Sequence, residues 1–270
     1  MDPCVSCGFL ASDYDRRDAL GTLRALAPVW RTMTDGLDGR VVTAVMGNAA
    51  ATADAVGASV DDGSLRDVII AIDNAVARMH KAPPDDEVLM RDVHTGVHEL
   101  HLAGRTIHAL GAGAPAHTGT LVQVNASGGG VPKAALPSAV IDRRGVVGDT
   151  QAERMHHGKP MQALSVWSAE VIAALRAEGH GVYPGAAGEN LTLTGIDWTT
   201  IRPGVQVAVG DVLAEISAFA TPCTKNAQWF SDRNFRRIDH IGHPGWSRAY
   251  AWVRRGGRIA PGDQVVVEPG

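Results

Sequence analysis

Residues 212–225 read Val-Leu-Ala-Glu-Ile-Ser-Ala-Phe-Ala-Thr-Pro-Cys-Thr-Lys, and they predict a β-strand that ends at a reactive cysteine. Pro222 cannot donate to a sheet ladder, so the strand at residues 212–219 is expected to stop before it. Cys223 then follows the strand end, with Lys225 two residues on, and a nearby ammonium favours thiolate over thiol. A thiolate is both a nucleophile and a soft metal ligand. The alternative is a small buried apolar cysteine.

Short strand-like segments separated by turns surround this stretch from residue 116 onward. They are residues 120–125, 164–167, 190–193, 205–209, 248–253 and 264–267. One helix, at residues 168–178, interrupts them, with Ser168 as its N-cap and Gly179 as its stop. Many short strands at turn-separated intervals predict a closed or nearly closed β-barrel.

Before residue 116 the pattern is helical. Apolar residues recur at three- and four-residue spacing over residues 16–36, 42–56, 65–80 and 87–110. The spacing is less regular over residues 42–56 than in the other three segments. We therefore predict an α+β protein of two domains, an antiparallel helical bundle over residues 1–115 and a β-barrel over residues 116–270.

Two features of the N-terminal half suggest metal or redox chemistry. His94 and His98 are four residues apart, so they share one helix face, which suits two ligands of one divalent metal. Two ligands do not complete a site, and solvated histidines are the alternative. Cys4 and Cys7 form a CxxC pair, which is half of a zinc site, a redox pair or a chance occurrence.

Composition restricts the range of functions. The chain has 270 residues, 45% hydrophobic and 20% charged, which is ordinary for a soluble globular protein. Its net charge of −4 gives no general attraction to nucleic acid or membranes. No apolar stretch has transmembrane length, no signal-peptide pattern is present, and the three cysteines do not suit a disulfide framework, so we expect a cytoplasmic protein. A late basic cluster predicts a binding place for a small anion: Arg233, Arg236, Arg237, Arg248, Arg254, Arg255 and Arg258.

Four ordered motifs in the C-terminal half resemble those of MOSC domains, the β-barrel domains named after the C-terminal part of molybdenum cofactor sulfurases. The similarity is greatest to the compact bacterial YiiM-like members. The motifs are residues 145–164, Gly188-Glu189-Asn190-Leu191, the turns from Arg202-Pro203-Gly204 to Gly210-Asp211, and Thr221-Pro222-Cys223-Thr224-Lys225.

This resemblance implies a barrel that binds molybdenum cofactor (molybdopterin) or carries sulfur. Cys223 would be the persulfide carrier or a molybdenum ligand, and Lys225 would assist it. His157 would orient a ligand or handle a proton, Arg154 would meet a phosphate or pterin oxygen, and Asn190 would meet a pterin edge. Each of these last three residues also has a structural alternative, as a turn cap, a surface charge and a brace of the barrel.

The chain departs from the family pattern directly after His157. The family commonly reads His-Gly-Gly-Pro followed by an acidic and a basic residue. Here Lys159 replaces a glycine, and Met161 and Gln162 replace the acid–base pair. The resemblance therefore leaves the substrate undefined, with Lys159 as an alternative ligand-binding group.

The N-terminal half resembles DinB-like four-helix bundles more faintly. The similarity rests on residues 91–111 and on the Cys-x-x-Cys-Gly-Phe pattern of residues 4–9. The three-histidine metal site of that family would use His94 and His98. Residues 41–60 contain no histidine, although the family's earlier helix would supply one there. We therefore predict a shortened, degenerate bundle with a structural role.

These patterns leave three functions open. The first is a sulfurtransferase or a molybdenum-cofactor-dependent oxidoreductase centred on Cys223. It would use a small anionic cofactor or a persulfide donor. The sulfur would come from a sulfur-donor protein or from a small persulfide, because nothing here resembles a cysteine desulfurase domain. The second is a non-catalytic carrier of the molybdopterin cofactor. The third is a metal-dependent transferase of a low-molecular-weight thiol that acts through the N-terminal bundle.

Overall fold

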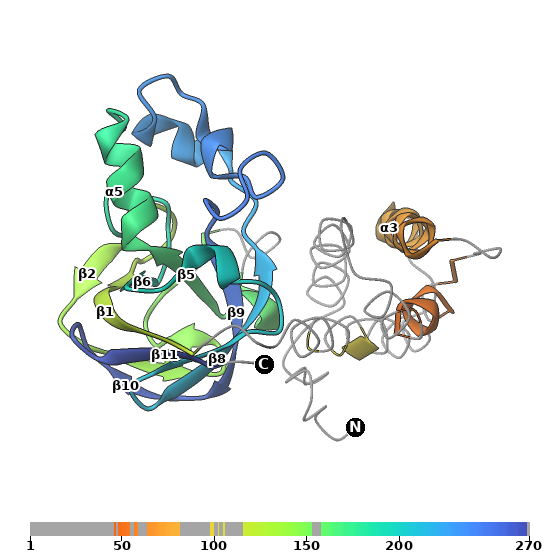
Figure 1. Cartoon of the computed structure of the whole chain (residues 1–270), viewed down its shortest axis with the longest axis horizontal. Helices are drawn as coiled ribbons and strands as arrows, with labels where there is room; N and C mark the ends of the chain where they lie inside the picture. The colour runs from red at the N-terminus through yellow and green to blue at the C-terminus, as the bar shows by residue number, and fades with distance from the viewer. Residues whose placement is uncertain are drawn as a thin grey trace. The chain divides into compact units, whose positions relative to one another are not determined.

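The computed structural model of the chain describes residues 46, 48–54, 57–58, 64–81, 98–99, 102, 105, 116–152 and 158–268. The chain divides into two compact units, residues 1–112 and residues 113–270, which are considered separately (Figure 1). Within the described ranges, no helix has the length and apolar character that a membrane crossing requires.

The best-described element of the N-terminal unit is helix α3 (Leu65–Lys81). Ser64 and Asp67 cap its start reciprocally: the Ser64 amide N–H donates to Asp67 Oδ2 at 3.0 Å, and the Asp67 amide N–H donates to Ser64 Oγ at 3.3 Å. One face of the helix is buried, through Val68, Ile69, Ile72 and Ala75. The helix predicted at residues 65–80 is thus confirmed.

The rest of the predicted bundle cannot be compared in the same way. Residues 48–54 are helical, within the helix predicted at residues 42–56. The predicted helix at residues 16–36 and most of the one at residues 87–110 lie outside the described residues. The antiparallel bundle and its DinB-like character therefore stay predictions.

The C-terminal unit is built mainly from short strands. They are β1 (His117–Ala126), β2 (Ala134–Leu136), β3 (Ala139–Asp142), β4 (Gly145–Val146), β5 (Leu164–Ser168), β6 (Leu191–Thr194), β7 (Gln206–Val209), β8 (Val212–Phe219), β9 (Ala249–Arg255), β10 (Gly257–Ile259) and β11 (Gln264–Glu268). The helices are α5 (Ala169–Ala177) and the 3-10 helices η1 (Pro160–Gln162), η2 (Trp198–Thr200), η3 (Thr224–Trp229) and η4 (Phe235–Ile238).

The larger sheet closes into a barrel. Its eight strands have the order β11-β7-β8-β9-β5-β6-β1-β2, and β11 pairs additionally with β1. That pairing places His117 opposite Val267 and Thr120 opposite Gln264, so β1 bridges β6 and β11. The predicted closed or nearly closed barrel is confirmed. A second, smaller sheet has the order β10-β3-β4.

Strands β5 and β6 are parallel, unlike the other neighbours in the barrel. Helix α5 provides the crossover that a parallel pair requires. Ser168 begins the helix as predicted, because its Oγ accepts hydrogen bonds from the amides of Glu170 at 3.1 Å and Val171 at 3.2 Å. Ile172 and Leu175 are its buried residues.

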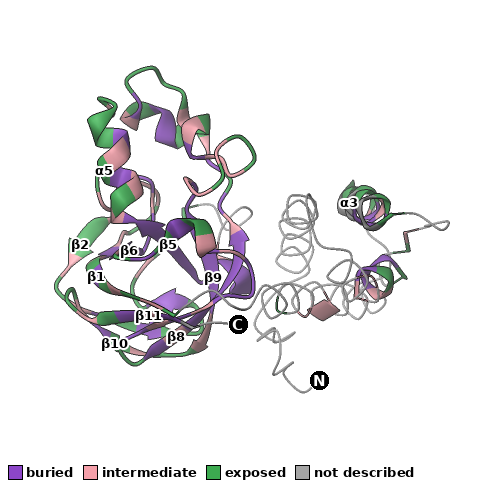
Figure 2. Cartoon of the chain, in the orientation of Figure 1, coloured by how far each residue is buried: buried purple, intermediate pink, exposed green. Residues whose placement is uncertain are grey.

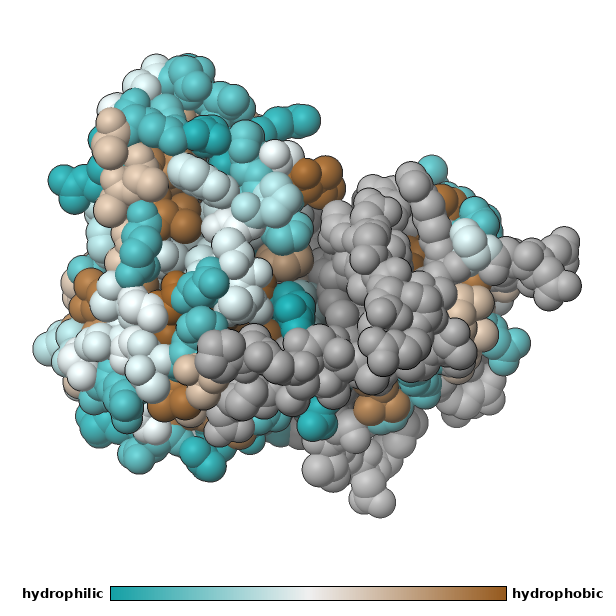
Figure 3. All heavy atoms as spheres, in the orientation of Figure 1, coloured by the Kyte–Doolittle hydropathy of each residue, from teal (hydrophilic) through white to brown (hydrophobic). Residues whose placement is uncertain are grey.

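The barrel interior is apolar and continuous. Purple, buried segments run along the barrel strands in Figure 2, and the core includes Leu121, Val166, Leu193, Val207, Ile216 and Ala251. On the visible face of this unit, hydrophobic side chains form scattered patches among hydrophilic ones (Figure 3). The core therefore accounts for the barrel, and polar groups buried beside it need a separate explanation.

Candidate functional site

Cys223 lies just beyond β8, where the chain leaves the barrel. The Ala220 amide N–H donates to the Arg248 carbonyl at 2.8 Å, which extends the β8–β9 ladder by one residue. Cys223 then precedes η3, and its carbonyl accepts from the Asn226 amide at 3.0 Å. Pro222 is buried, whereas Cys223 is half-buried. The strand end predicted before Pro222 is confirmed, and the cysteine keeps access to solvent.

Two buried side chains of the β9 segment lie next to this cysteine. Arg248 and Tyr250 are two residues apart and point to the same side of the strand, while Ala249 and Ala251 face the core. Burial raises the pKa of Tyr250, the positive charge of Arg248 opposes this, and the charge of Cys223 adds to it. Arg248 and Cys223 thus both act electrostatically on the buried Tyr250.

The Arg248 guanidinium is buried without full hydrogen bonding. Arg248 is 6% exposed, and its Nε has no hydrogen-bond partner among the described residues. A Cβ added at Gly188 would lie 3.8 Å from Arg248 Nη1, so the guanidinium lies close to the Gly188-Glu189-Asn190-Leu191 segment. Buried arginines are normally paired, and an orphaned donor of this kind points to a missing ligand.

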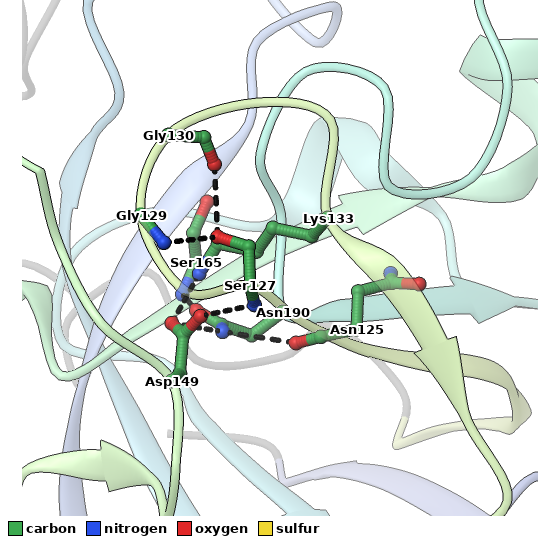
Figure 4. Close-up of polar contacts among 8 residues, drawn as sticks. All are labelled: Asn125, Ser127, Gly129, Gly130, Lys133, Asp149, Ser165 and Asn190. Atoms are coloured by element: carbon green, nitrogen blue, oxygen red, sulfur yellow. Dashed lines mark hydrogen bonds and ion pairs between the residues drawn. The ribbon is translucent and has the colours of Figure 1, made fainter.

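Lys133 and Asp149 form an ion pair on the loops beside that segment, with side chains only 9% and 4% exposed (Figure 4). Burial lowers the pKa of Lys133, and Asp149 opposes this by its charge and its hydrogen bond. Asp149 Oδ1 also accepts from the Ser127 amide at 2.8 Å, which ties the turn after β4 to the loop at residues 127–130. The pair therefore fixes the position of a buried cation whose charge also acts on Arg248.

Asn190 joins three parts of the barrel (Figure 4). Its Oδ1 accepts from the Ser165 amide at 3.1 Å, and its Nδ2 donates to the Asn125 carbonyl at 3.2 Å and to Asp149 Oδ2 at 3.0 Å. These bonds use both hydrogens of the Nδ2 amide group, so the only further hydrogen bond that the Asn190 side chain can form is one accepted by Oδ1. Asn190 braces the barrel, and its direct contact with a pterin stays a prediction.

Glu189 is fully buried directly before Asn190. Its Oε1 accepts from the Gly185 amide at 2.6 Å and from Thr192 Oγ at 3.3 Å, and its Oε2 has no partner among the described residues. Burial raises the pKa of Glu189, while the Gly185 N–H and the Arg248 charge oppose this. The buried carboxyl group thus favours its neutral form more than an exposed glutamate does.

The other predicted site residues are less well placed by the structure. Arg154, His157 and His94 lie outside the described residues. His98 is described and half-buried, and the described part of the chain contains no group of three metal-binding side chains. Lys225 lies on η3 with an exposed side chain, and its role beside Cys223 stays a prediction.

Sequence reasoning missed most of the polar groups around the cysteine. Arg248 was included only as one of seven basic residues near the C-terminus, and Glu189 and Asp149 only as letters within quoted motifs. Lys133 and Tyr250 were not selected at all. The alternation of the strand gave no signal for the burial of Arg248, because Ala249 and Ala251 face the core and a residue of the opposite parity is expected on the outer face.

The fold and site define a closed β-barrel domain with a cysteine at the end of β8 and a buried arginine, Arg248, at the start of the paired strand β9. Residues 153–266 match the family model of the MOSC domain, which supports a MOSC domain in the C-terminal unit. The MOSC-type barrel expected from the motifs is therefore supported.

Individual known proteins resemble the same part of the chain. The uncharacterized protein YflK of Bacillus subtilis (strain 168) is 29% identical over 136 residues, which cover 49% of this chain and 60% of YflK. The structure of the YUAD protein of Bacillus subtilis has a TM-score of 0.46 at 16% identity and covers 58% of this chain and 98% of that one. The structure of YiiM from Geobacillus stearothermophilus has a TM-score of 0.43 at 20% identity. The match covers 57% of this chain and 75% of the YiiM chain.

Proposed function

We propose that the C-terminal domain carries sulfur on Cys223 and passes it to an acceptor. The observation that carries this proposal is the half-buried thiol at the end of β8, with the buried Arg248 and Tyr250 beside it. A cysteine thiolate is the nucleophile in sulfur exchange, and the half-buried Cys223 is accessible to a sulfur donor. MOSC domains are in general related to molybdenum cofactor sulfurases, which agrees with this chemistry.

The proposed reaction has two balanced steps. The Cys223 thiolate attacks the outer sulfur of a donor persulfide, a bond forms between these two sulfurs, and the donor's own S–S bond breaks. The donor leaves as a thiolate. A nucleophilic acceptor then attacks the outer sulfur of the Cys223 persulfide, and the Cys223 thiolate is released as the leaving group.

A second candidate is the binding of molybdenum cofactor, with which MOSC domains are associated. The buried Arg248 and Lys133 favour it, because two cations suit the phosphate of a pterin cofactor and a thiolate has the softness that suits molybdenum. Arg248 and Lys133 would hold the cofactor's anionic end, and Cys223 would face its metal. When bound, the cofactor supplies oxygen-atom or electron transfer; without turnover, the protein is a carrier.

Intact mass spectrometry of the whole chain, with and without reductant, tests the leading proposal when combined with metal analysis of the same sample. After incubation with glutathione persulfide, we expect one extra sulfur that reductant removes. Cys223→Ala should abolish it, whereas the Cys4→Ala/Cys7→Ala double variant should retain it. Sulfur that persists in Cys223→Ala would rule the proposal out, and stoichiometric molybdenum with a pterin-sized ligand would favour the second candidate.

A further inference from the structure

Arg248 differs from the other six arginines of the C-terminal basic cluster in being buried. Arg233, Arg236, Arg255 and Arg258 are exposed. Two others are half-buried and paired: Arg237 Nη2 donates to Glu178 Oε1 at 2.5 Å, and Arg254 Nε donates to Glu215 Oε2 at 3.0 Å. Arg248 makes none of the ion pairs found among the described residues. Its partner must therefore come from elsewhere or be missing.

Arg248 has charged neighbours but forms no ion pair with any of them in the described part of the chain. Lys133 and Arg248 are two buried cations whose charges act on each other. Asp149 is already bound to Lys133, and the Glu189 carboxyl group bonds to Gly185 and Thr192 and not to Arg248. The described residues thus leave the buried Arg248 guanidinium without a hydrogen-bonded counter-ion, and the charges of Arg248 and Cys223 both act on Tyr250.

We infer that Arg248 and Tyr250 bind an oxyanion group, such as a phosphate, sulfonate or carboxylate, on the ligand that meets Cys223. An arginine provides a rigid fork of N–H donors that matches such a group, and the Tyr250 hydroxyl on the same side of β9 adds a further donor. The position of the ligand next to the sulfur rests on the proposed function, but binding of the anion itself needs only the two side chains.

This inference has a consequence for stability. A buried guanidinium without a partner destabilises the ligand-free protein, since the desolvation of its charge is not offset. An apolar side chain of similar length should therefore leave the ligand-free fold at least as stable while removing anion binding. Such a trade between stability and binding is typical of residues kept for function.

Thermal unfolding of the whole chain with increasing inorganic phosphate, sulfate, thiosulfate or acetate tests the inference, with ionic strength held constant by chloride. The wild type should be stabilised in a saturable manner by at least one of these anions, because a ligand that binds only the folded state raises its melting temperature. Arg248→Met should raise or preserve the melting temperature without anion and weaken binding on the order of tenfold to a hundredfold. Tyr250→Phe should weaken it less.

Arg258→Gln is the matched control, because it removes the same charge from an exposed position. It should leave the anion response unchanged. The inference is overturned if no anion stabilises the wild type, if Arg258→Gln loses the response as fully as Arg248→Met, or if Arg248→Met lowers the melting temperature without anion.

Cys223→Ser separates this inference from the proposed function. This variant should lose the added sulfur and retain anion binding. If sulfur transfer is not observed, anion binding can still support the oxyanion site, and if no anion binds, sulfur transfer can still be observed. The anion that binds best indicates which kind of ligand carries the oxyanion group. Thiosulfate that binds and also adds sulfur to Cys223 indicates an anionic sulfur donor, with sulfite as the leaving group, whereas phosphate as the preferred anion indicates a phosphorylated cofactor.

Discussion

Asn190 donates a hydrogen bond from Nδ2 to Oδ2 of Asp149 at 3.0 Å, and this bond connects the start of β6 to the turn after β4. The same carboxylate pairs with Lys133, so one amide supports the placement of a cation whose charge acts on Arg248. The site is therefore held by the barrel and not by its loops alone.

Asn190→Ala should destabilise the domain by about 3 kcal/mol, because it leaves the Ser165 amide and the Asn125 carbonyl without their partners and loosens Asp149. Urea unfolding measures the change. Asn234→Ala, at an exposed position, is the control and should remain within about 0.5 kcal/mol of wild type. Equal stability of the two variants would show that the bonds of Asn190 are replaced by water.

Glu189 should make the stability of the domain fall as pH rises above 4.5, the ordinary glutamate pKa. Burial raises the pKa of Glu189 in the folded state, so above pH 4.5 the folded protein keeps a proton that the unfolded chain has released. Each pH unit up to the folded-state pKa then removes up to about 1.4 kcal/mol of the free energy of unfolding.

Glu189→Gln should remove this pH dependence while keeping an acceptor for the Gly185 amide. Denaturant titrations at a series of pH values measure it, and Asp232→Asn, at an exposed carboxylate, serves as the control. A slope that persists in Glu189→Gln means that another group is responsible.

Gly145 and Gly148 allow a steric clash to be separated from backbone strain. Both have positive φ, 108° and 91°, but a Cβ at Gly145 would lie 1.9 Å from the Ala163 carbonyl oxygen, while nothing lies within 4 Å of one at Gly148. Gly148→Ala should cost about 1 kcal/mol for the backbone conformation alone. Gly145→Ala should cost about 3 kcal/mol or more beyond that. Calorimetry of both variants tests this, and similar losses would mean that β4 moves away freely.

Arg254 and Glu215 should behave as a partly buried ion pair in which the buried Glu215 depends on Arg254. Arg254 Nε donates to Glu215 Oε2 at 3.0 Å, and the Glu215 side chain is 2% exposed. Arg254→Met removes the ion-pair partner of that buried carboxylate and should destabilise the protein by about 3 kcal/mol. The Arg254→Met/Glu215→Leu double variant should recover most of the loss in urea unfolding. No recovery would indicate that Arg254 acts through packing on Trp252 instead.

The parts of the fold that depend on local sequence were predicted well. Strand β8 has the bounds expected from its apolar run before Pro222, and Ser168 caps α5 because its hydroxyl reaches the next amides. Strands β2, β3, β4 and β10 were missed. Each is only two to four residues long and is defined by distant pairing, as where Arg258 lies opposite Val140, so no period in the sequence reveals it.

In the candidate site, too, the features that depend on local sequence were predicted and those that depend on distant pairing were missed. Cys223 was found from its neighbours, Pro222 and Lys225. Its proximity to Arg248 depends on the β8–β9 register, which places Ala218 opposite Tyr250 and contains two irregularities that a sequence pattern does not indicate. The raised pKa of Glu189 likewise comes from burial by several elements, and a single sequence does not reveal such burial.

The pairing of β1 with β11 also determines how the domain is made. The first strand of the barrel finds one of its neighbours only in residues 264–267, near the other end of the domain. During synthesis, that edge of β1 stays unpaired until the last strand has left the ribosome, and an unpaired edge is a template for strands of other molecules. Closure by such a distant pair is slow, so the yield of soluble protein should depend on translation rate and chaperones more than on final stability.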